Sequence, residues 1–268
     1  DHTWFCALIE TVEMEKPWRP VIWESKKTEL MESIKFYKPL NSSVTQARSS
    51  FFNSINSIFR GHVTSQAISG SSFRTYSVKA GREGKPLPLV LCVSMGLEEG
   101  VGAGLDIDDI SSILKGHLPD RYQFNPSSPL QSEAHGFRKS PDLKDKIHCV
   151  TYVLDASKIS IMSTKMERAE RIPQLVLLTK VDEACSLVRE DIRNVYKSGY
   201  IKELMEKAAA RVGVPLSCII PVKNYSEELE LETNNDILLL SAVVQMLRFV
   251  DNFFDEISDQ MSSVTTGK

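Results

Sequence analysis

The sequence lacks the features of several protein classes. Its five cysteines are scattered among 268 residues without a Cys-x-x-Cys pair, so neither a disulfide framework nor a zinc site is expected. No uninterrupted apolar run approaches the ~18 residues of a membrane-spanning helix, and no basic region with a following apolar stretch marks a signal peptide. The net charge of −3 gives no basic footprint for nucleic acid. We therefore expect a cytoplasmic protein that neither spans a membrane nor binds nucleic acid.

What the chain does have is the composition of a globular protein, with 42% hydrophobic and 25% charged residues. Short apolar strands alternate with amphipathic helices along it. Strands are predicted at residues 73–79, 88–92, 147–154, 173–178 and 216–222, and helices at residues 26–38, 106–114, 160–171 and 235–257. A long charged amphipathic segment at residues 183–212 is expected to break near Ser198 and Gly199. Since strands and helices alternate, the sequence predicts an α/β fold with a mostly parallel sheet that is covered on both faces.

The most informative motif follows the predicted strand at residues 173–178. Thr179, Lys180 and Asp182 form a Thr-Lys-x-Asp tetrad. The Asp182 carboxylate can accept two hydrogen bonds, from N1–H and from the exocyclic amine of guanine, while the stem of Lys180 can lie along the base. Adenine lacks this pair of donors and would leave the carboxylate unpaired, which is costly. Taken alone, the tetrad is explained equally well by an ordinary polar turn after a buried strand.

The rest of the chain supports a base-reading interpretation of this tetrad. Ligands of parallel sheets bind at the carboxyl ends of the strands, and Lys223 and Asn224 follow the predicted strand at residues 216–222. The tetrad and this later turn occur in the order, and roughly at the separation, of the two base-reading loops of a GTPase. The predicted base-binding residues are therefore Thr179, Lys180, Asp182, Lys223 and Asn224.

Five segments carry a more specific resemblance, which covers roughly residues 36–257. They are SSFFNSINSIFRGHVTSQA (49–67), LPDRYQFN (118–125), SPDLKDKIHCVTYVLD (140–155), LLTKVD (177–182) and NY (224–225). In these segments the chain resembles the interferon-induced protein 44 family, and most closely its fish-type members, which lack an N-terminal TLDc-like module.

The resemblance implies an interferon-inducible, mostly cytoplasmic protein with a role in the antiviral immune response. It also implies a GTPase-like domain, a Ras-like P-loop NTPase sandwich with a mostly parallel sheet. On this basis we expect an N-terminal extension with a helix at residues 1–40, the GTPase-like domain at residues 41–258 and a disordered tail at residues 259–268.

The chain departs from the family where phosphate would bind. In the family, a buried first strand and a glycine-rich phosphate loop ending in Gly-Lys precede the position of Ser49. Here Gln46 is followed by Ala47 and Arg48, which lead directly into Ser49, so both the first strand and the phosphate loop are expected to be missing. Such a loop wraps phosphate with backbone N–H groups, and one flexible arginine cannot replace several fixed donors.

The remaining phosphate-site positions are only partly filled. By resemblance, Ser49 and Ser50 stand where phosphate and Mg²⁺ would bind, with Ser49 as the Mg²⁺ ligand if nucleotide binds. Gly96 is a further predicted phosphate contact. Val93 stands where the family carries an aspartate that orders metal-bound water, and a valine side chain cannot do this.

Two functions from different classes remain open. The first is a pseudo-GTPase without catalytic residues, a scaffold that acts by binding other proteins; the missing loop and Val93 favour it. The alternative is a guanine-nucleotide-binding switch that holds GTP or GDP with Mg²⁺ and is at most a weak GTPase. That alternative requires a phosphate loop between Arg48 and Ser49, which would separate their Cα atoms far beyond the ~3.8 Å of one peptide. The oligomeric state is not predicted.

Overall fold

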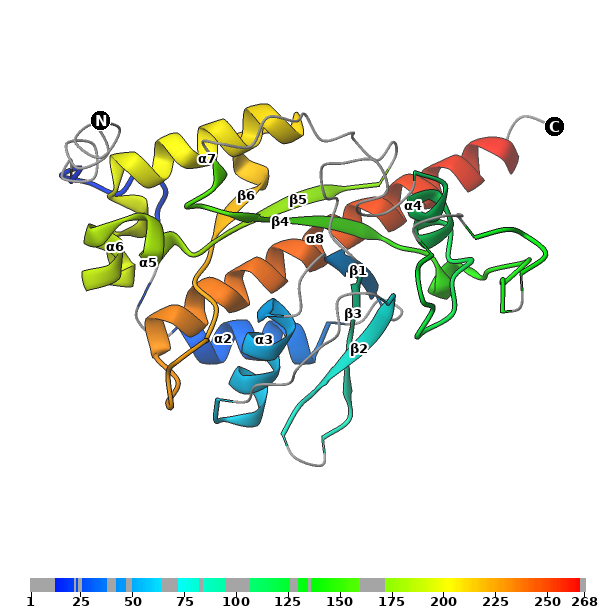
Figure 1. Cartoon of the computed structure of the whole chain (residues 1–268), viewed down its shortest axis with the longest axis horizontal. Helices are drawn as coiled ribbons and strands as arrows, with labels where there is room; N and C mark the ends of the chain where they lie inside the picture. The colour runs from blue at the N-terminus through cyan, green and yellow to red at the C-terminus, as the bar shows by residue number, and fades with distance from the viewer. Residues whose placement is uncertain are drawn as a thin grey trace.

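The computed structural model describes residues 13–21, 23, 26–37, 42–46, 50–63, 72–81, 84–94, 107–125, 130–134, 136–159 and 172–265. They form an α/β fold in which helices lie on both faces of one sheet (Figure 1). The sheet has six strands in the order β2-β3-β1-β4-β5-β6. The strands are β1 (Ser42–Gln46), β2 (Arg74–Lys79), β3 (Pro86–Val93), β4 (Cys149–Asp155), β5 (Gln174–Thr179) and β6 (Ile219–Pro221).

The sheet is mostly parallel, as the sequence predicted. β2 and β3 form an antiparallel hairpin, and each of the other described pairs of neighbouring strands is parallel. In particular, the two apolar runs predicted at residues 147–154 and 173–178 become β4 and β5, which are parallel neighbours in one sheet. An arrangement in separate sheets would have contradicted the predicted fold class.

The predicted absence of the first strand is wrong. β1 lies in the middle of the sheet, parallel to β3 on one side and to β4 on the other. Its sequence, SSVTQ, contains a single large apolar residue, Val44, and so lacks the apolar run that is typical of a central parallel strand. Both of its neighbours offer backbone hydrogen bonds, and this tertiary pairing overrides a weak local preference.

The helices divide between the two faces. On one face lie α2 (Lys26–Lys35), α3 (Ser50–Arg60) and α8 (Thr233–Thr265). On the other lie α4 (Ile107–Leu114), α5 (Val181–Ala184), α6 (Ser186–Glu190) and α7 (Gly199–Val212). Short 3₁₀ helices complete the described elements at η1 (Leu143–Asp145), η3 (Ile192–Tyr196) and η4 (Leu216–Cys218). The helix predicted at residues 160–171 lies outside the described residues.

β5 shows how the sheet separates two hydrophobic cores. Leu175 and Leu177 face one core, Val176 and Leu178 face the other, and all four side chains are fully buried. This is the two-residue period of a strand that is covered on both faces. The first core is completed by α2, α3 and α8, so the helix of the predicted N-terminal extension packs against the rest of the domain.

The last helix is longer and more apolar than the others. Among the described residues, α8 alone is long and apolar enough to cross a membrane by length and composition, over Thr233–Gln260. Of its apolar window, 56% is buried in the protein, and the buried side chains include Ile237, Leu240 and Val243 in the first core. We therefore interpret its apolar side as core. The helix continues past Ile257 to Thr265, so residues 259–265, expected to be in a disordered tail, are helical.

An N-terminal strap, residues 13–19, runs along the outside of η3 and α7. Two backbone hydrogen bonds fix it, from Met14 N to Lys197 O (2.9 Å) and from Trp18 N to Tyr196 O (3.1 Å). The Arg19 guanidinium then donates to the carbonyl oxygens of Leu216 (2.9 Å) and Ile219 (2.8 Å) and lies over the rings of Trp18 and Tyr196. Arg19 thus ties the strap to the start of β6.

Replacing Arg19 with methionine is expected to destabilise the protein by about 1–3 kcal/mol, since two carbonyl oxygens lose a charged donor. Methionine keeps much of the apolar contact, so the loss reports the hydrogen bonds. Urea unfolding would measure it. Lys16→Met is the matched control in the same strap, because Lys16 is exposed and surface changes usually shift stability by less than about 0.5 kcal/mol. Equal effects of the two substitutions would contradict this role for Arg19.

Candidate base-binding site at the ends of β5 and β6

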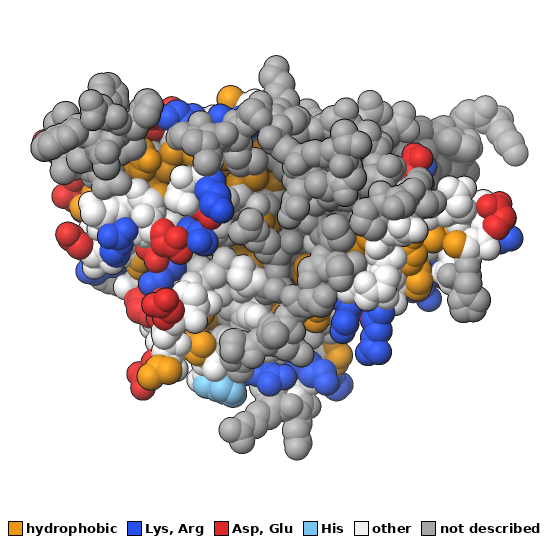
Figure 2. Space-filling model, viewed as in Figure 1, with side chains coloured by type: hydrophobic (Ala, Val, Ile, Leu, Met, Phe, Trp, Pro, Cys, Tyr) orange, Lys and Arg blue, Asp and Glu red, His pale blue; other side chains and the backbone are white. Residues whose placement is uncertain are grey.

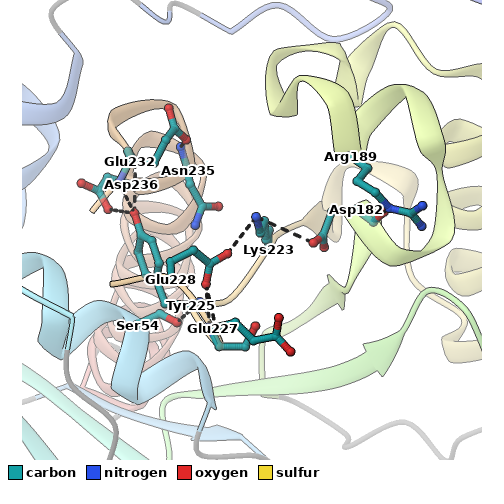
Figure 3. A network of polar contacts seen from close by, with 11 residues as sticks. Ser54, Asp182, Arg189, Lys223, Tyr225, Glu227, Glu228, Glu232, Asn235 and Asp236 are labelled. Atoms are coloured by element: carbon teal, nitrogen blue, oxygen red, sulfur yellow. Dashed lines mark hydrogen bonds and ion pairs between the residues drawn. The ribbon is translucent and has the colours of Figure 1, made fainter. Parts of the chain in front are cut away.

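The two predicted base-reading segments meet at one edge of the sheet. β5 and β6 are parallel neighbours that end at Thr179 and Pro221, so the residues after them lie close together. Lys223 Nζ is 3.8 Å from Asp182 Oδ2, and Figure 3 shows the Lys223 side chain between Asp182 and Glu228. The structure therefore brings together the two predicted residues that follow different strands.

Glu228, which the sequence did not single out, holds Lys223 from the other side. The distance from Lys223 Nζ to Glu228 Oε1 is 2.9 Å, and Glu228 Oε2 accepts hydrogen bonds from the backbone N–H groups of Ser226 (2.8 Å) and Glu227 (3.2 Å). Burial by itself would raise the pKa of Glu228, but the Lys223 ammonium and backbone hydrogen bonds, including the one from Ser226 N–H, outweigh it and lower the pKa to about 2. Glu228 is therefore a permanent anion at neutral pH.

Lys223 is correspondingly a permanent cation. Burial alone would lower its pKa, but the carboxylates of Glu228, Asp182 and Glu232 raise the pKa above its ordinary value. Asp182 therefore faces a positive charge, and its side chain remains 21% exposed. A guanine base that approached Asp182 would have to share the carboxylate with Lys223.

Thr179 and Lys180 are directed elsewhere. The Thr179 hydroxyl donates to Leu154 O (3.0 Å), and the residue is buried at the centre of the sheet edge. Lys180 has a left-handed backbone with φ of 60°, which is uncommon for a residue other than glycine. Its Nζ lies 3.6 Å from Asp155 Oδ2 and 3.1 Å from Glu183 Oε2. Neither head group is directed at Asp182, so the structure does not assemble the whole tetrad around one point.

Asp155 is a buried acidic residue at the end of β4 and the last residue of one segment that carries the family resemblance. Its Oδ1 accepts hydrogen bonds from the backbone N–H (3.0 Å) and the hydroxyl (2.6 Å) of Ser157. Burial would raise the pKa of Asp155, but the Ser157 hydrogen bonds and the charges of Lys180 and Lys158 lower it on balance. Asp155 is the anion that holds Lys180 away from Asp182.

Asn224 links the base-binding edge to the start of α3. Its Nδ2 donates to Ser50 Oγ (3.4 Å), and the backbone N–H of the next residue, Tyr225, donates to Ser54 Oγ (2.9 Å). The predicted base-side residue Asn224 and the predicted phosphate-side residue Ser50 are therefore in contact. The contact uses the Ser50 hydroxyl to fix the loop after β6.

On the phosphate side, the sequence and the described residues supply few of the groups that usually hold a nucleoside triphosphate with Mg²⁺. β1 ends at Gln46 and α3 begins at Ser50, and the three residues between them include neither glycine nor lysine. At the end of β3, Val93 is 4% exposed and belongs to the buried hydrophobic residues. Within the described residues, no group of three His, Cys, Asp or Glu side chains could hold a metal ion.

Some predicted phosphate-site positions cannot be placed. Ser49, the predicted Mg²⁺ ligand, and Gly96 both lie outside the described residues. The Arg48–Ser49 junction also lies outside the described residues. Its Cα–Cα distance is the quantity that distinguishes a direct peptide bond from an intervening phosphate loop.

Two further residues stabilise the edge and were not predicted. Arg189 donates from Nε to Asp182 O and from Nη2 to Glu183 O, both at 3.1 Å, and so fixes the short α5 helix that carries Asp182. Tyr225 Oη accepts from Glu232 N (2.8 Å) and lies 2.7 Å from Asp236 Oδ1. The family resemblance had included Tyr225, but no sequence pattern indicated that it would anchor the start of α8.

The comparisons with known proteins agree with the sequence resemblance. No protein-family model matches the chain. Human interferon-induced protein 44-like is 41% identical over 259 residues, which cover 86% of this chain and 57% of that protein. Human interferon-induced protein 44 is 39% identical, covering 85% of this chain and 57% of that protein, and the mouse protein is 36% identical, covering 85% and 60%.

The chain therefore spans less than two thirds of the length of these curated relatives. Over the matched region, the identities confirm the relationship that the five sequence segments predicted. The chain is a homologue of interferon-induced protein 44 and of its 44-like relative.

Proposed function

We propose that this protein is an interferon-inducible protein of the antiviral immune response, and that its degenerate GTPase-like domain acts as a protein-binding scaffold in the cytoplasm. The names of its relatives support the interferon link. One observation carries the scaffold assignment: only Ala47, Arg48 and Ser49 separate the end of β1 from the start of α3.

The strand order supports a Ras-like arrangement. In the order β2-β3-β1-β4-β5-β6, the one antiparallel strand, β2, lies at an edge, and β1 lies in the centre. In a P-loop NTPase the connection from the central strand to the next helix carries the phosphate loop. Here that connection runs from β1 to α3 and has only three residues, fewer than such a loop needs. This supports a Ras-like domain without its phosphate-binding part.

The chemistry of the site supports a protein without GTPase activity. Backbone N–H groups of a glycine-rich loop and its lysine normally neutralise the phosphates, and the β1–α3 connection supplies neither. Val93 cannot order metal-bound water. We therefore assign no catalytic residue, and other proteins are the proposed partners.

A guanine-nucleotide-binding switch is the second candidate, and one observation favours it. Asp182 lies at the carboxyl end of β5 with an exposed edge, where a base-reading carboxylate belongs. The same geometry is also explained by the ion pair with Lys223, which needs no ligand. The two candidates differ in whether Asp182 matters for function.

Expression of the chain in cells that lack an interferon response should reduce viral titre, and Asp182→Ala should reduce it equally. The scaffold needs no guanine, so loss of the base-reading carboxylate should leave the effect intact. Plaque assays at matched protein levels would measure this, with Glu206→Ala at an exposed position on α7 as the control. Loss of the effect in Asp182→Ala alone would establish the nucleotide switch, and no effect of the native chain would contradict the proposed function.

A further inference from the structure

A polar pocket of about 330 Å³ lies beside the base-binding edge. One wall comes from the end of α6 and the start of η3, and the other from the β6–α8 loop, residues 222–232, with the start of α8. Lys223 lines it, but Asp182 does not. Figure 3 shows the residues of the loop and of α8 on one side and Arg189 on the other. The pocket therefore adjoins the predicted guanine position and shares Lys223 with it, but it does not include Asp182.

Negative charge predominates around this pocket. Four carboxylates line it, against the two cations Arg189 and Lys223; the carboxylates are those of Glu190, Asp191, Glu228 and Glu232. Arg189 is already committed to two backbone carbonyl groups of α5, and Lys223 to Glu228. Figure 2 shows acidic side chains gathered where the β6–α8 loop reaches α8. The pocket would therefore repel an anion such as phosphate.

One of these carboxylates is free for a ligand. Asp191 pairs with Arg193 (2.7 Å), and Glu232 accepts from the backbone N–H groups of Asn234 and Asn235. Glu190, by contrast, is exposed at the rim and has no hydrogen-bond or ion-pair partner in the described part of the chain. Glu190 is thus an unpaired anion at the pocket entrance.

The second observation is an unpaired acceptor inside the pocket. Asn235 is 3% exposed, and its Oδ1 has no hydrogen-bond partner among the described residues. Figure 3 shows the Asn235 side chain directed from α8 toward Glu228 and Lys223. A buried carbonyl oxygen without a donor is unfavourable, and a ligand with N–H groups would satisfy it.

We propose that this pocket binds an arginine side chain of a protein partner, an inference that rests on the scaffold function proposed above. A guanidinium group carries five N–H donors and no acceptor, which matches a pocket with one free carboxylate and one buried free acceptor. Next to the pocket, Leu229 of the same loop is 91% exposed. It offers an apolar contact to the residues that flank the arginine.

The test compares N-acetyl-arginine amide with N-acetyl-citrulline amide, which has the same shape without the charge. Each would be titrated into the ¹⁵N-labelled chain while backbone amide shifts are followed. We expect saturable shifts at residues 188–192 and 223–235 with the arginine compound at millimolar concentration. Citrulline should bind about two- to fivefold more weakly, as the loss of an exposed charge pair predicts.

Variants of the pocket sharpen the test. Glu190→Gln should weaken arginine binding about three- to fivefold relative to the native chain. Asn235→Ala, as a separate variant, should weaken arginine binding more than Glu190→Gln does. Glu230→Gln is the matched control. Glu230 lies exposed in the β6–α8 loop but does not line the pocket. Because Glu190 is at the surface, its substitution tests the pocket even if Asn235→Ala fails to fold.

Three results would overturn the pocket assignment: equal binding of the two compounds, shifts centred elsewhere, or no saturable shift. The titration contains neither nucleotide nor virus, so its failure is distinguishable from failure of the antiviral experiment. If the chain binds arginine but has no antiviral effect, the result would support the pocket assignment and contradict the proposed scaffold function.

Discussion

Isothermal titration of this protein with GTP and Mg²⁺ is expected to give a dissociation constant of millimolar order. The predicted base-side residues Asp182 and Lys223 would contact one end of the nucleotide only. Most of the binding energy in such sites comes from charge-assisted bonds to phosphates and metal, and each missing bond removes about 1.5–3 kcal/mol. What remains is on the order of −4 kcal/mol, which corresponds to a millimolar constant.

Hydrolysis of GTP should be undetectable in the same preparation. Val93 cannot order metal-bound water, and the β1–α3 connection cannot hold the phosphates. Release of inorganic phosphate would be the measurement. Asp182→Ala should weaken the millimolar binding further and leave hydrolysis undetectable. Micromolar affinity that Asp182→Ala abolishes would show instead that the pocket is intact and that the protein is a nucleotide switch.

Replacing Lys27 with methionine is expected to destabilise the protein by about 2–3 kcal/mol at neutral pH. Lys27 forms an ion pair with Asp236, whose side chain is fully buried and also contacts the Tyr225 hydroxyl. Removing one partner of a buried pair leaves an uncompensated charge, which typically costs about 3–5 kcal/mol. The Lys27 side chain is 29% exposed, so solvent screening reduces the expected loss.

The effect of Lys27→Met should depend on pH. Burial raises the pKa of Asp236, and Lys27 and Tyr225 only partly offset the rise. A folded-state pKa above the unfolded value contributes stability at low pH that is lost as the pH rises through the folded-state pKa. Without Lys27 this pKa rises further, so the variant should lose more stability near pH 7 than near the unfolded aspartate pKa of about 3.9.

Urea unfolding of both proteins at pH 7 and at mildly acidic pH would test this linkage. Lys26→Met is the matched control, since among the described residues Lys26 pairs only with the exposed Glu29 (2.6 Å) and such surface pairs contribute about 0–1 kcal/mol. Adding Asp236→Asn to Lys27→Met should restore part of the stability. A loss that is the same at both pH values, or the same for Lys26 and Lys27, would contradict a buried charge pair.

Periodicity alone predicted β4 and β5, two neighbouring parallel strands of the sheet. The runs that become β4 and β5 are continuous and apolar because both faces of those strands are covered, and a continuous apolar run is visible in a sequence. β1 was not predicted because it lacks such an apolar run. Its sequence, SSVTQ, carries no such run, and its central place depends on hydrogen bonds to β3 and β4, which are distant in the chain.

The sequence by itself indicated the relatives of the chain and predicted the location of the candidate site. The five segments that carry the resemblance are amino-acid sequences, which can be compared with other proteins without a structure. The order of the Thr-Lys-x-Asp tetrad and the Lys223 turn along the chain predicted that both lie at one edge of the sheet. Only the tertiary structure decided what each side chain does there. It pairs Asp182 with Lys223 and buries the Thr179 hydroxyl against Leu154 O. Such contacts join strands and loops from distant parts of the chain, and the geometry between them exists only after the sheet has formed.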